Sequence, residues 1–232
     1  MALVGGGSNP QPGEISLAHN GILFLDEAVE FSRNTLELLR QPLEDKKITV
    51  SRAKYSVEYP SNFILIASMN PCPCGFYNHP DKECTCGAGT VFRYLNKISG
   101  PLLDRIDLHI EVVPVAYGEM SDTAPQESSA EVRERVIMAR QRQRERFRDI
   151  PGVHTNAMMN PAMIRDFCPL DEKSGLLLNT AMERLNLSAR AYDRIIKVAR
   201  TIADLDSFDD IRPQHISEAI NYRSLDRASW GR

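Results

Sequence analysis

The sequence predicts an α/β domain followed by an all-helical bundle. Two short runs of consecutive apolar residues, 22–25 and 63–67, each lead into polar residues, which is typical of strands in a parallel sheet. Beyond Pro114 the apolar residues recur at helical spacing. A chain of 232 residues suffices for one large domain or two small ones.

Composition and charge narrow the classes of protein. The chain is 42% hydrophobic and 25% charged, as is usual for a globular protein in water. Its formal net charge of -3 means that any nucleic-acid contact has to come from a local basic patch. The sequence contains no membrane-length apolar run, and its first residues lack the features of a secretory signal. A cytoplasmic location and no membrane contact are the default expectations.

The α/β half is expected to contain three strands, a helix and a hairpin. Residues 1–20 are rich in Gly, Pro, Asn and Ser and predict irregular structure. The continuous apolarity of residues 22–25 predicts a strand that is buried on both faces. Leucines at helical spacing predict a helix at 33–42, and strand-forming residues around a polar middle predict a β-hairpin at 46–60. Further strands are expected at residues 63–67 and 108–113.

The half after Pro114 begins with a polar segment, residues 116–130, which we interpret as a linker. Helices are expected at residues 131–148, 161–167, 173–185 and 213–223. A longer helix is expected after Ser188, with one apolar stripe made of Tyr192, Ile195, Ile196, Ala199, Ile202 and Ala203. We therefore expect the α/β part to cover residues 1–115, a linker with a charged helix 116–155, and a helical domain 156–232.

Two carboxylates, Asp26 and Glu27, follow the first apolar run directly. Ligands of open α/β sheets bind at the edge where the strands end. Asp26 is suited to hold a magnesium ion, directly or through its waters. Glu27 is suited to polarise a water molecule for attack on a terminal phosphate. The alternative is a strand that simply ends in charged residues.

Three later residues extend this interpretation. Asn70 follows the second apolar run, so we expect it beside the acidic pair, orienting the same water. Arg105 is expected to reach a phosphate, including one on a neighbouring subunit; a salt bridge to Asp104 or Asp107 is its alternative. Arg190 lies in the first turn predicted for the long helix.

In this order the features resemble the Walker B, sensor 1, arginine-finger and sensor 2 elements of an AAA+ ATPase. More narrowly, the chain is similar to the magnesium-chelatase-like ATPases of the ComM/YifB family. The strings that carry the resemblance are PGEISLAHNGILFLDE, ILIASMNPCPCG, ISGPLLDRIDLHIEV, LSARAYDRIIKVARTIADL and HISEAINYRSLDR. They span nearly the whole chain. The resemblance implies a partial AAA+ three-layer αβα core followed by an all-α lid bundle.

The resemblance also implies a role for each residue. Asp26 and Glu27 would be the Walker B residues, which bind magnesium and activate water. Asn70 would be sensor 1, and Arg105 would be the finger that acts in trans in a homo-oligomeric ring, expected to be a hexamer. The implied cofactors are ATP and Mg²⁺, and the implied activity is ATP hydrolysis.

On the lid, the resemblance implies that Arg190 is sensor 2 and contacts the nucleotide, with Arg194 ranked second for that role. One motif of such enzymes, G-x-x-x-x-G-K-[ST], is missing from the sequence. Gly5-Gly6-Gly7 lacks the Lys-Ser/Thr that must follow. In the family this loop precedes the region where the chain begins. We therefore expect a C-terminal fragment that does not bind or hydrolyse ATP well alone.

The predicted hairpin is basic: it contains Lys46, Lys47, Arg52 and Lys54. The resemblance equates it with the pre-sensor-1 hairpin, which in ring helicases of this clade points into the central channel. A basic tip is expected there to grip a phosphate backbone without reading its sequence. A solvated edge hairpin, protected by its lysines against further pairing, is the alternative.

The family role implied is a DNA helicase that drives branch migration in recombination, acting on single-stranded or branched DNA. Two other functions stay open. An ATPase subunit of a magnesium chelatase would share the ATP chemistry but not the substrate. A non-enzymatic module would bind partner subunits through the ring surface.

Four of the five cysteines, Cys72, Cys74, Cys84 and Cys86, form two C-x-C arms. Four thiolates on two short arms suit a tetrahedral structural zinc site. The loop is rich in Pro and Gly and has little to pack, so a metal would be needed to order it and would stiffen Asn70. Four free thiols or an iron–sulfur cluster are the alternatives, and Cys168 is expected to be buried.

Overall fold

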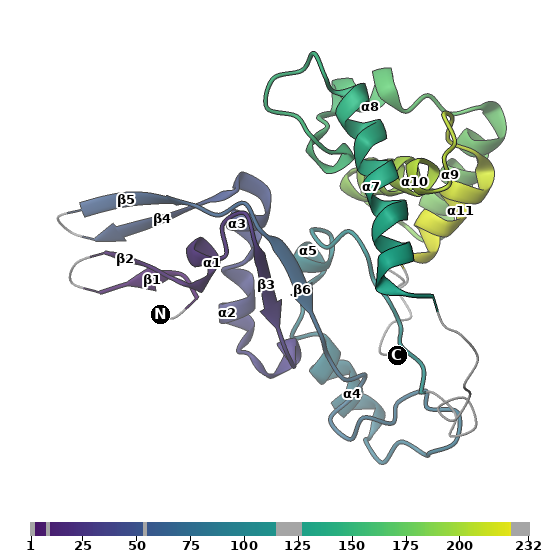
Figure 1. The fold of residues 1–232 in the computed structure, drawn as a ribbon. Coiled ribbons are helices and arrows are strands. Elements are labelled where there is room, and N and C mark those ends of the chain that lie inside the picture. Colours follow the sequence, from purple (N-terminus) through teal and green to yellow (C-terminus); the bar gives the residue numbers. More distant parts are fainter. Residues whose placement is uncertain (1–2, 8–9, 53–54, 115–126, 224–232) are drawn as a thin grey trace. The chain divides into compact units, whose positions relative to one another are not determined.

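The computed structural model describes residues 3–7, 10–52, 55–114 and 127–223 (Figure 1). They divide into two compact units, and the second unit begins at Asp107. The first unit mixes strands and helices, and the second is helical. This confirms the predicted order of an α/β part followed by an all-helical one.

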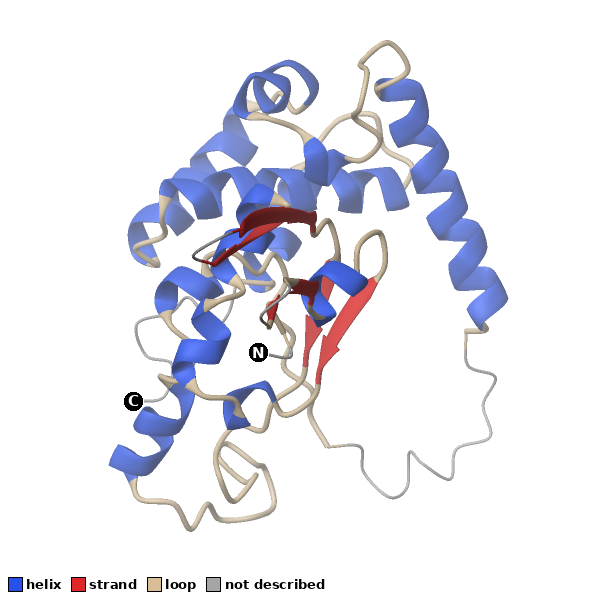
Figure 2. Ribbon diagram, turned by 90° about the vertical axis from the view of Figure 1, so that its left-hand side faces the viewer, coloured by secondary structure: helices blue, strands red, loops and turns tan. Residues whose placement is uncertain are grey.

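The strands described in the first unit form three separate pairs (Figure 2). Two of the pairs are antiparallel, and the third is parallel. The antiparallel pairs are β1 (Gly5–Gly6) with β2 (Gln11–Pro12), and β4 (Lys47–Arg52) with β5 (Tyr55–Pro60). The parallel pair is β3 (Ile22–Leu25) with β6 (Ile64–Ala67). The two apolar runs and the hairpin are thus confirmed as strands.

The helices of the first unit are short. They are α1 (Glu14–Leu17), the 3₁₀ helix η1 (Ala28–Glu30), α2 (Arg33–Glu37), α3 (Arg40–Asp45), α4 (Ala88–Leu95) and α5 (Gly100–Leu103). The single helix predicted at 33–42 is therefore two helices. Pro42 has no N–H to donate to the carbonyl of Leu38, so the helical hydrogen-bond ladder is interrupted there.

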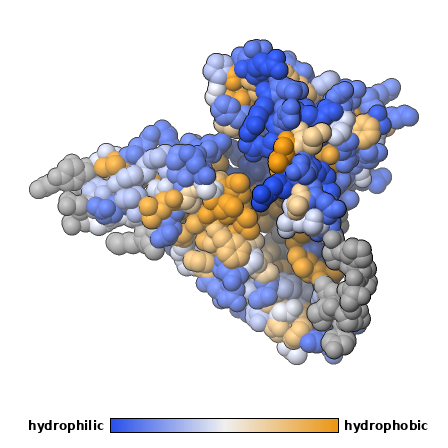
Figure 3. Space-filling model, in the orientation of Figure 1, coloured by the Kyte–Doolittle hydropathy of each residue, from blue (hydrophilic) through white to orange (hydrophobic). Residues whose placement is uncertain are grey.

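The β3–β6 pair is packed on one face only. Alternate residues of a strand point to opposite faces, and in β3 the buried residues are Leu23 and Leu25. The other face exposes the large apolar side chains of Ile22, Phe24, Ile64 and Ile66, and Figure 3 shows an apolar area over β3 and β6. The prediction of a first strand buried on both faces is wrong, because nothing described in this unit covers the second face.

The strand predicted at residues 108–113 is also wrong: this segment forms neither helix nor strand. Three of its residues, Ile110, Val112 and Val113, are largely exposed. The backbone N–H of His109 donates to the carbonyl of Tyr222, which lies beyond the last helix. A strand requires a partner strand for its backbone hydrogen bonds, and no described strand pairs with this segment.

The second unit consists of helices whose bounds lie close to the predicted ones. They are α7 (Ser129–Arg146), the 3₁₀ helix η2 (Asn156–Met158), α8 (Pro161–Phe167), α9 (Glu172–Arg184), α10 (Ala189–Leu205) and α11 (Pro213–Asn221). Four helices begin at a side chain that accepts a backbone N–H, the role typical of Ser, Asn and Asp. These capping residues are Ser128, Asn160, Asp171 and Ser188.

The core of the second unit lies around α10. The predicted stripe is confirmed, since Ile195, Ile196, Ala199 and Ala203 are almost completely buried. Cys168 is buried in the same cluster, as predicted. Among the described residues, no helix combines the length and the apolar character that crossing a membrane requires.

Candidate functional site

The parallel pairing of β3 with β6 joins the acidic pair to the polar residues after β6. Leu25 pairs with Ala67 in the register, so Asp26 lies beside Ser68. The Ser68 hydroxyl donates a hydrogen bond to Asp26 Oδ1. The N–H of Ala28 donates to the Ser68 carbonyl at 2.8 Å. The ends of the two strands are therefore fixed to each other at this edge.

Glu27 occupies the turn between β3 and η1. Its backbone is left-handed, with φ 49° and ψ 47°, which is uncommon for a residue other than glycine. Its N–H donates to Ser68 Oγ at 3.2 Å and to Asp26 Oδ1 at 3.1 Å. Both carboxylate residues are exposed, and so is Asn70, three residues beyond the end of β6. The register thus brings the acidic pair and Asn70 to the same end of the strand pair.

Ser68 is a residue of this site that the local sequence pattern does not indicate. Aligning the two apolar runs in parallel register, Ile22 with Ile64, sets Asp26 opposite Ser68. The signal was therefore present in the sequence. To recognise it, one has to know which strands are neighbours and in which register they pair.

Arg105 is held inside the first unit by a carboxylate from α3. Its Nε and Nη2 donate to Glu44 Oε2, the former at 3.0 Å, and its Nη1 donates to the Pro101 carbonyl at 2.6 Å. The side chain is 9% exposed. The partner of Arg105 is therefore Glu44, rather than Asp104 or Asp107 as the alternative interpretation had it.

A second carboxylate, Glu37 of α2, holds the beginning of α5. The Ser99 hydroxyl donates to Glu37 Oε1 and accepts from the N–H of Leu102, which caps the helix. Hydrogen bonds from Ser99 and Arg40 hold the pKa of Glu37 below its usual value. Together with Glu44, Glu37 fastens both ends of the short α5 segment to α2 and α3.

The lid candidates Arg190 and Arg194 lie in the first two turns of α10, which Ser188 caps. Arg194 donates to the carboxylate of Asp107 and is half-buried. Arg190 is the more exposed of the two.

The basic residues of the hairpin are divided between its two ends. Lys46, with φ 55°, ends α3, and Lys47 begins β4, so both lie at the base. Lys47 Nζ lies 2.9 Å from Glu58 Oε2, and this hydrogen bond raises the pKa of Lys47. Arg52 ends β4 near the turn, whereas Lys54 lies outside the described residues. Lys46 and Lys47 therefore do not contribute to the expected basic tip.

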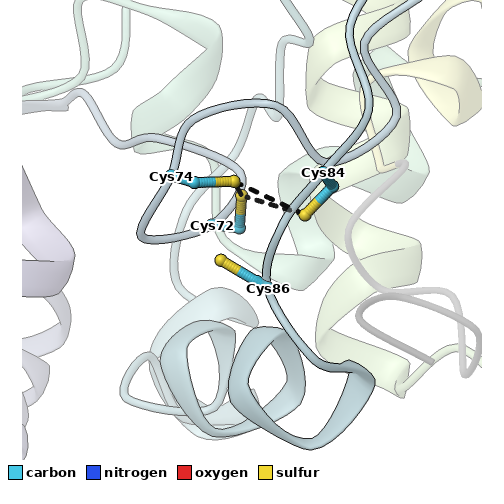
Figure 4. A group of neighbouring side chains, drawn as sticks. All are labelled: Cys72, Cys74, Cys84 and Cys86. Atoms are coloured by element: carbon cyan, nitrogen blue, oxygen red, sulfur yellow. Dashed lines mark hydrogen bonds between the residues drawn. The ribbon is translucent and has the colours of Figure 1, made fainter.

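The four clustered cysteines converge from the two arms of one loop (Figure 4). Their sulfur atoms all lie within 4.8 Å of one another, and none forms a disulfide. The backbone N–H of Phe76 lowers the pKa of the Cys74 thiol to about 5. This is the only group of three or more His, Cys, Asp or Glu side chains within the described ranges whose geometry suits a metal ion.

Both halves of the chain match the sequence profiles of a known protein family. The profile described as magnesium chelatase, subunit ChlI, matches residues 1–120, and its C-terminal counterpart matches residues 126–223. The uncharacterized protein YifB of Escherichia coli is 48% identical over 97% of the chain, and the competence protein ComM of Haemophilus influenzae is 47% identical over 97%. The chain spans only 44% and 43% of these two proteins. The DNA replication licensing factor mcm6 of Dictyostelium discoideum is 22% identical over 92% of the chain and 24% of its own length.

Proposed function

The chain belongs to the magnesium chelatase ChlI family, and from this membership we propose that it is part of an AAA+ ATP-hydrolysing motor that acts on DNA. The observation that supports this proposal most is the register of β3 and β6. It brings Asp26 and Glu27 to the end of the strand that Asn70 follows. Such an edge is where open α/β sheets bind their ligands.

In this proposal Asp26 holds Mg²⁺, because magnesium prefers a few carboxylate oxygens together with phosphate oxygens and water. The hydroxyl of Ser68 orients the Asp26 carboxylate. When bound, the ion would neutralise charge on the phosphates of ATP. Glu27 takes a proton from the attacking water, and Asn70 orients that water.

Arg105 supplies positive charge to the phosphate of a neighbouring subunit in a ring, which we propose to be a hexamer. Because Arg105 is paired with Glu44 in its own chain, this action requires that pair to open. Arg190 contacts the nucleotide from the lid as sensor 2, and Arg194 is the second candidate. Arg194 would first have to leave Asp107.

The proposed polymer substrate is single-stranded or branched DNA, and the proposed role is helicase action in branch migration. Two relatives, the competence protein ComM and the DNA replication licensing factor mcm6, support a DNA substrate. Arg52 at the end of β4, Lys46 and Lys47 at the base of the hairpin, and Lys54 would contact the phosphate backbone. The closely spaced cysteines form no disulfide, which supports a reducing, cytoplasmic location. We propose zinc as a third cofactor, besides ATP and Mg²⁺.

The test is ATP hydrolysis by the intact gene product, with and without single-stranded or branched DNA. We expect DNA to stimulate hydrolysis and the Glu27→Gln variant to lose about 10²–10⁴-fold in rate, as is typical when a general base is removed. Glu14→Gln, which changes an exposed carboxylate of α1, is the matched control. Wild-type rates in Glu27→Gln would contradict the role of Glu27.

An ATPase subunit of a magnesium chelatase is the second candidate, favoured by the description of the matching family. It predicts hydrolysis that no DNA stimulates. A non-enzymatic partner-binding module is the third, favoured by the missing phosphate-loop string in these 232 residues. It predicts no hydrolysis by the intact gene product under either condition.

A further inference from the structure

The loop between β6 and α4, residues 71–87, is held by very few packed side chains. Cys72 is its only buried residue, and the loop contains neither helix nor strand. Fixing the backbone of each residue costs about 1–2 kcal/mol. The burial of one small side chain does not offset that cost over a loop of this length. An additional interaction is therefore needed to order it.

The sulfur positions fit a single tetrahedral ion. Zinc–sulfur bonds of about 2.3 Å in a tetrahedron place the ligand sulfurs about 3.8 Å apart. The Sγ–Sγ distances are 3.3 Å for Cys72–Cys74, 3.5 Å for Cys74–Cys84 and 3.7 Å for Cys72–Cys84, with Cys86 pointing toward the same centre (Figure 4). A disulfide would require about 2.05 Å. An iron–sulfur cluster places several irons and sulfides between the thiolates and would separate them further.

The chemistry of the donors also fits zinc. Four thiolates in tetrahedral array favour Zn²⁺ over the hard cations Mg²⁺ and Ca²⁺, which prefer oxygen. A structural zinc site is closed by four protein ligands, and here the two C-x-C arms supply all four. His79 lies between the arms, but its Nδ1 accepts the N–H of Asp81 at 3.0 Å instead. The His79 imidazole therefore stabilises a turn of the loop instead of acting as a zinc ligand.

The loop leads directly into α4, and α4 contacts the segment that follows the acidic pair. The Tyr94 hydroxyl forms a hydrogen bond with Glu30, and Lys97 Nζ lies 3.9 Å from Glu30 Oε2. Burial raises the pKa of Tyr94 to about 12, the nearby carboxylates of Glu30 and Glu27 act in the same direction, and Cys72 lies near the same hydroxyl. Tyr94 is thus close both to the cysteine cluster and to the residues after β3.

We infer that Cys72, Cys74, Cys84 and Cys86 bind one structural zinc ion that fixes the loop between Asn70 and α4. The ion holds the segment that follows β6 in place, because Cys72 is two residues after Asn70. It also fastens the start of α4, because Cys86 directly precedes the helix cap Gly87. The binding of zinc depends only on residues of this chain. The consequence for Asn70 as sensor 1 rests on the proposed function.

The first test measures metal in the purified 232-residue chain by mass spectrometry, without ATP or DNA. We expect one zinc per chain and, after exchange with Co²⁺, the thiolate charge-transfer absorption of tetrahedral cobalt. Cys84→Ser should lose most of its zinc. Cys168→Ser, which changes a cysteine buried in the second unit, should keep it.

A wild-type chain without stoichiometric zinc, or with iron in its place, would overturn the zinc assignment. Equal zinc content in Cys84→Ser would overturn the assignment of the ligands. Because neither result depends on hydrolysis, both are distinct from failure of the proposed motor function. Removing zinc from the wild-type chain with a chelator, and then restoring it, gives a second measurement if Cys84→Ser does not fold.

The second test measures amide hydrogen exchange before and after chelation. We expect exchange in α4 to become faster when zinc is removed, and exchange in α9 and α10 to stay unchanged. Restored zinc should restore the protection of α4. Unchanged protection of α4 in the metal-free chain would overturn the positioning role of the ion.

Discussion

Asp204 in α10 is a completely buried carboxylate surrounded by donors. Arg146 donates to its two oxygens at 2.8 and 2.5 Å, and Asn156 Nδ2 donates at 2.8 Å. Arg200, also buried, lies 3.1 Å away. These bonds join the end of α7 and η2 to the centre of the helical unit. Removing one partner of such a buried group leaves the other charges uncompensated.

We predict that Asp204→Asn lowers the free energy of unfolding of the helical unit by about 3–5 kcal/mol. Urea denaturation followed by circular dichroism measures this change. The matched control is Asp209→Asn, which changes an 89% exposed partner of Arg142 and should cost less than about 1 kcal/mol. Equal stabilities of the two variants would contradict the buried network.

His215, in the first turn of α11, is buried, and its Nδ1 accepts the N–H of Arg212 at 3.0 Å. Burial lowers its pKa, although Asp206, 3.4 Å from Nε2, acts in the opposite direction. The unfolded chain therefore binds a proton at His215 at higher pH than the folded chain does. The stability that neutral His215 contributes is complete above its unfolded pKa of about 6.5 and is lost as pH falls below it.

We predict that His215→Gln makes the free energy of unfolding less dependent on pH just below about 6.5, the unfolded pKa of histidine. Glutamine retains an acceptor for the N–H of the capping residue but does not titrate. Denaturation at a series of pH values checks this. His154→Gln, at an exposed histidine, is the control and should leave the wild-type slope. If the free energy of unfolding of His215→Gln depended on pH as in the wild type, His215 would not be the group responsible.

Among the secondary-structure elements, the β3–β6 pair has the clearest consequence for the isolated chain. One face packs Leu25 in the unit, and the other exposes Phe24 at 59%. Exposed apolar patches on sheets promote association. Substitutions in β3 should therefore affect association or stability, depending on which face of the strand the side chain occupies.

We predict that Phe24→Ser reduces binding of a hydrophobic dye and aggregation of the chain with little loss of stability. Leu25→Ala, on the packed face, should instead lower the free energy of unfolding by about 2–5 kcal/mol. Dye fluorescence, light scattering and denaturation distinguish the two variants. Strong destabilisation by Phe24→Ser would show that its face is packed.

At the scale of elements, some structures could be predicted from the sequence and others could not. The longest apolar helix of the second unit, α10, was predictable because it combines an apolar stripe with a capping residue, Ser188. The hairpin was predictable from local strand propensity. The segment 108–113 was not, because a strand depends on a distant partner as well as on its own residues.

For the whole molecule, the absence of the phosphate-loop string from these 232 residues limits how tightly the chain can bind ATP. The backbone amides and the lysine of that loop supply most contacts to the phosphates of ATP. We predict that the 232-residue chain binds Mg²⁺–ATP with a Kd of about 1 mM or weaker, measured by titration calorimetry. A family member that contains the loop serves as the positive control. Micromolar binding by this chain alone would contradict the prediction.

The sequence by itself determined the two apolar strands, the hairpin, the longer helices after Pro114, the two C-x-C arms and the carboxylates that end β3, because these depend on neighbouring residues. Only the tertiary structure decided that Asp26 meets Ser68, that Arg105 pairs with Glu44, and that the four sulfurs converge. It also decided that one face of the β3–β6 pair is exposed. These contacts join residues far apart in the chain, so they depend on strand register and packing, which local patterns do not specify.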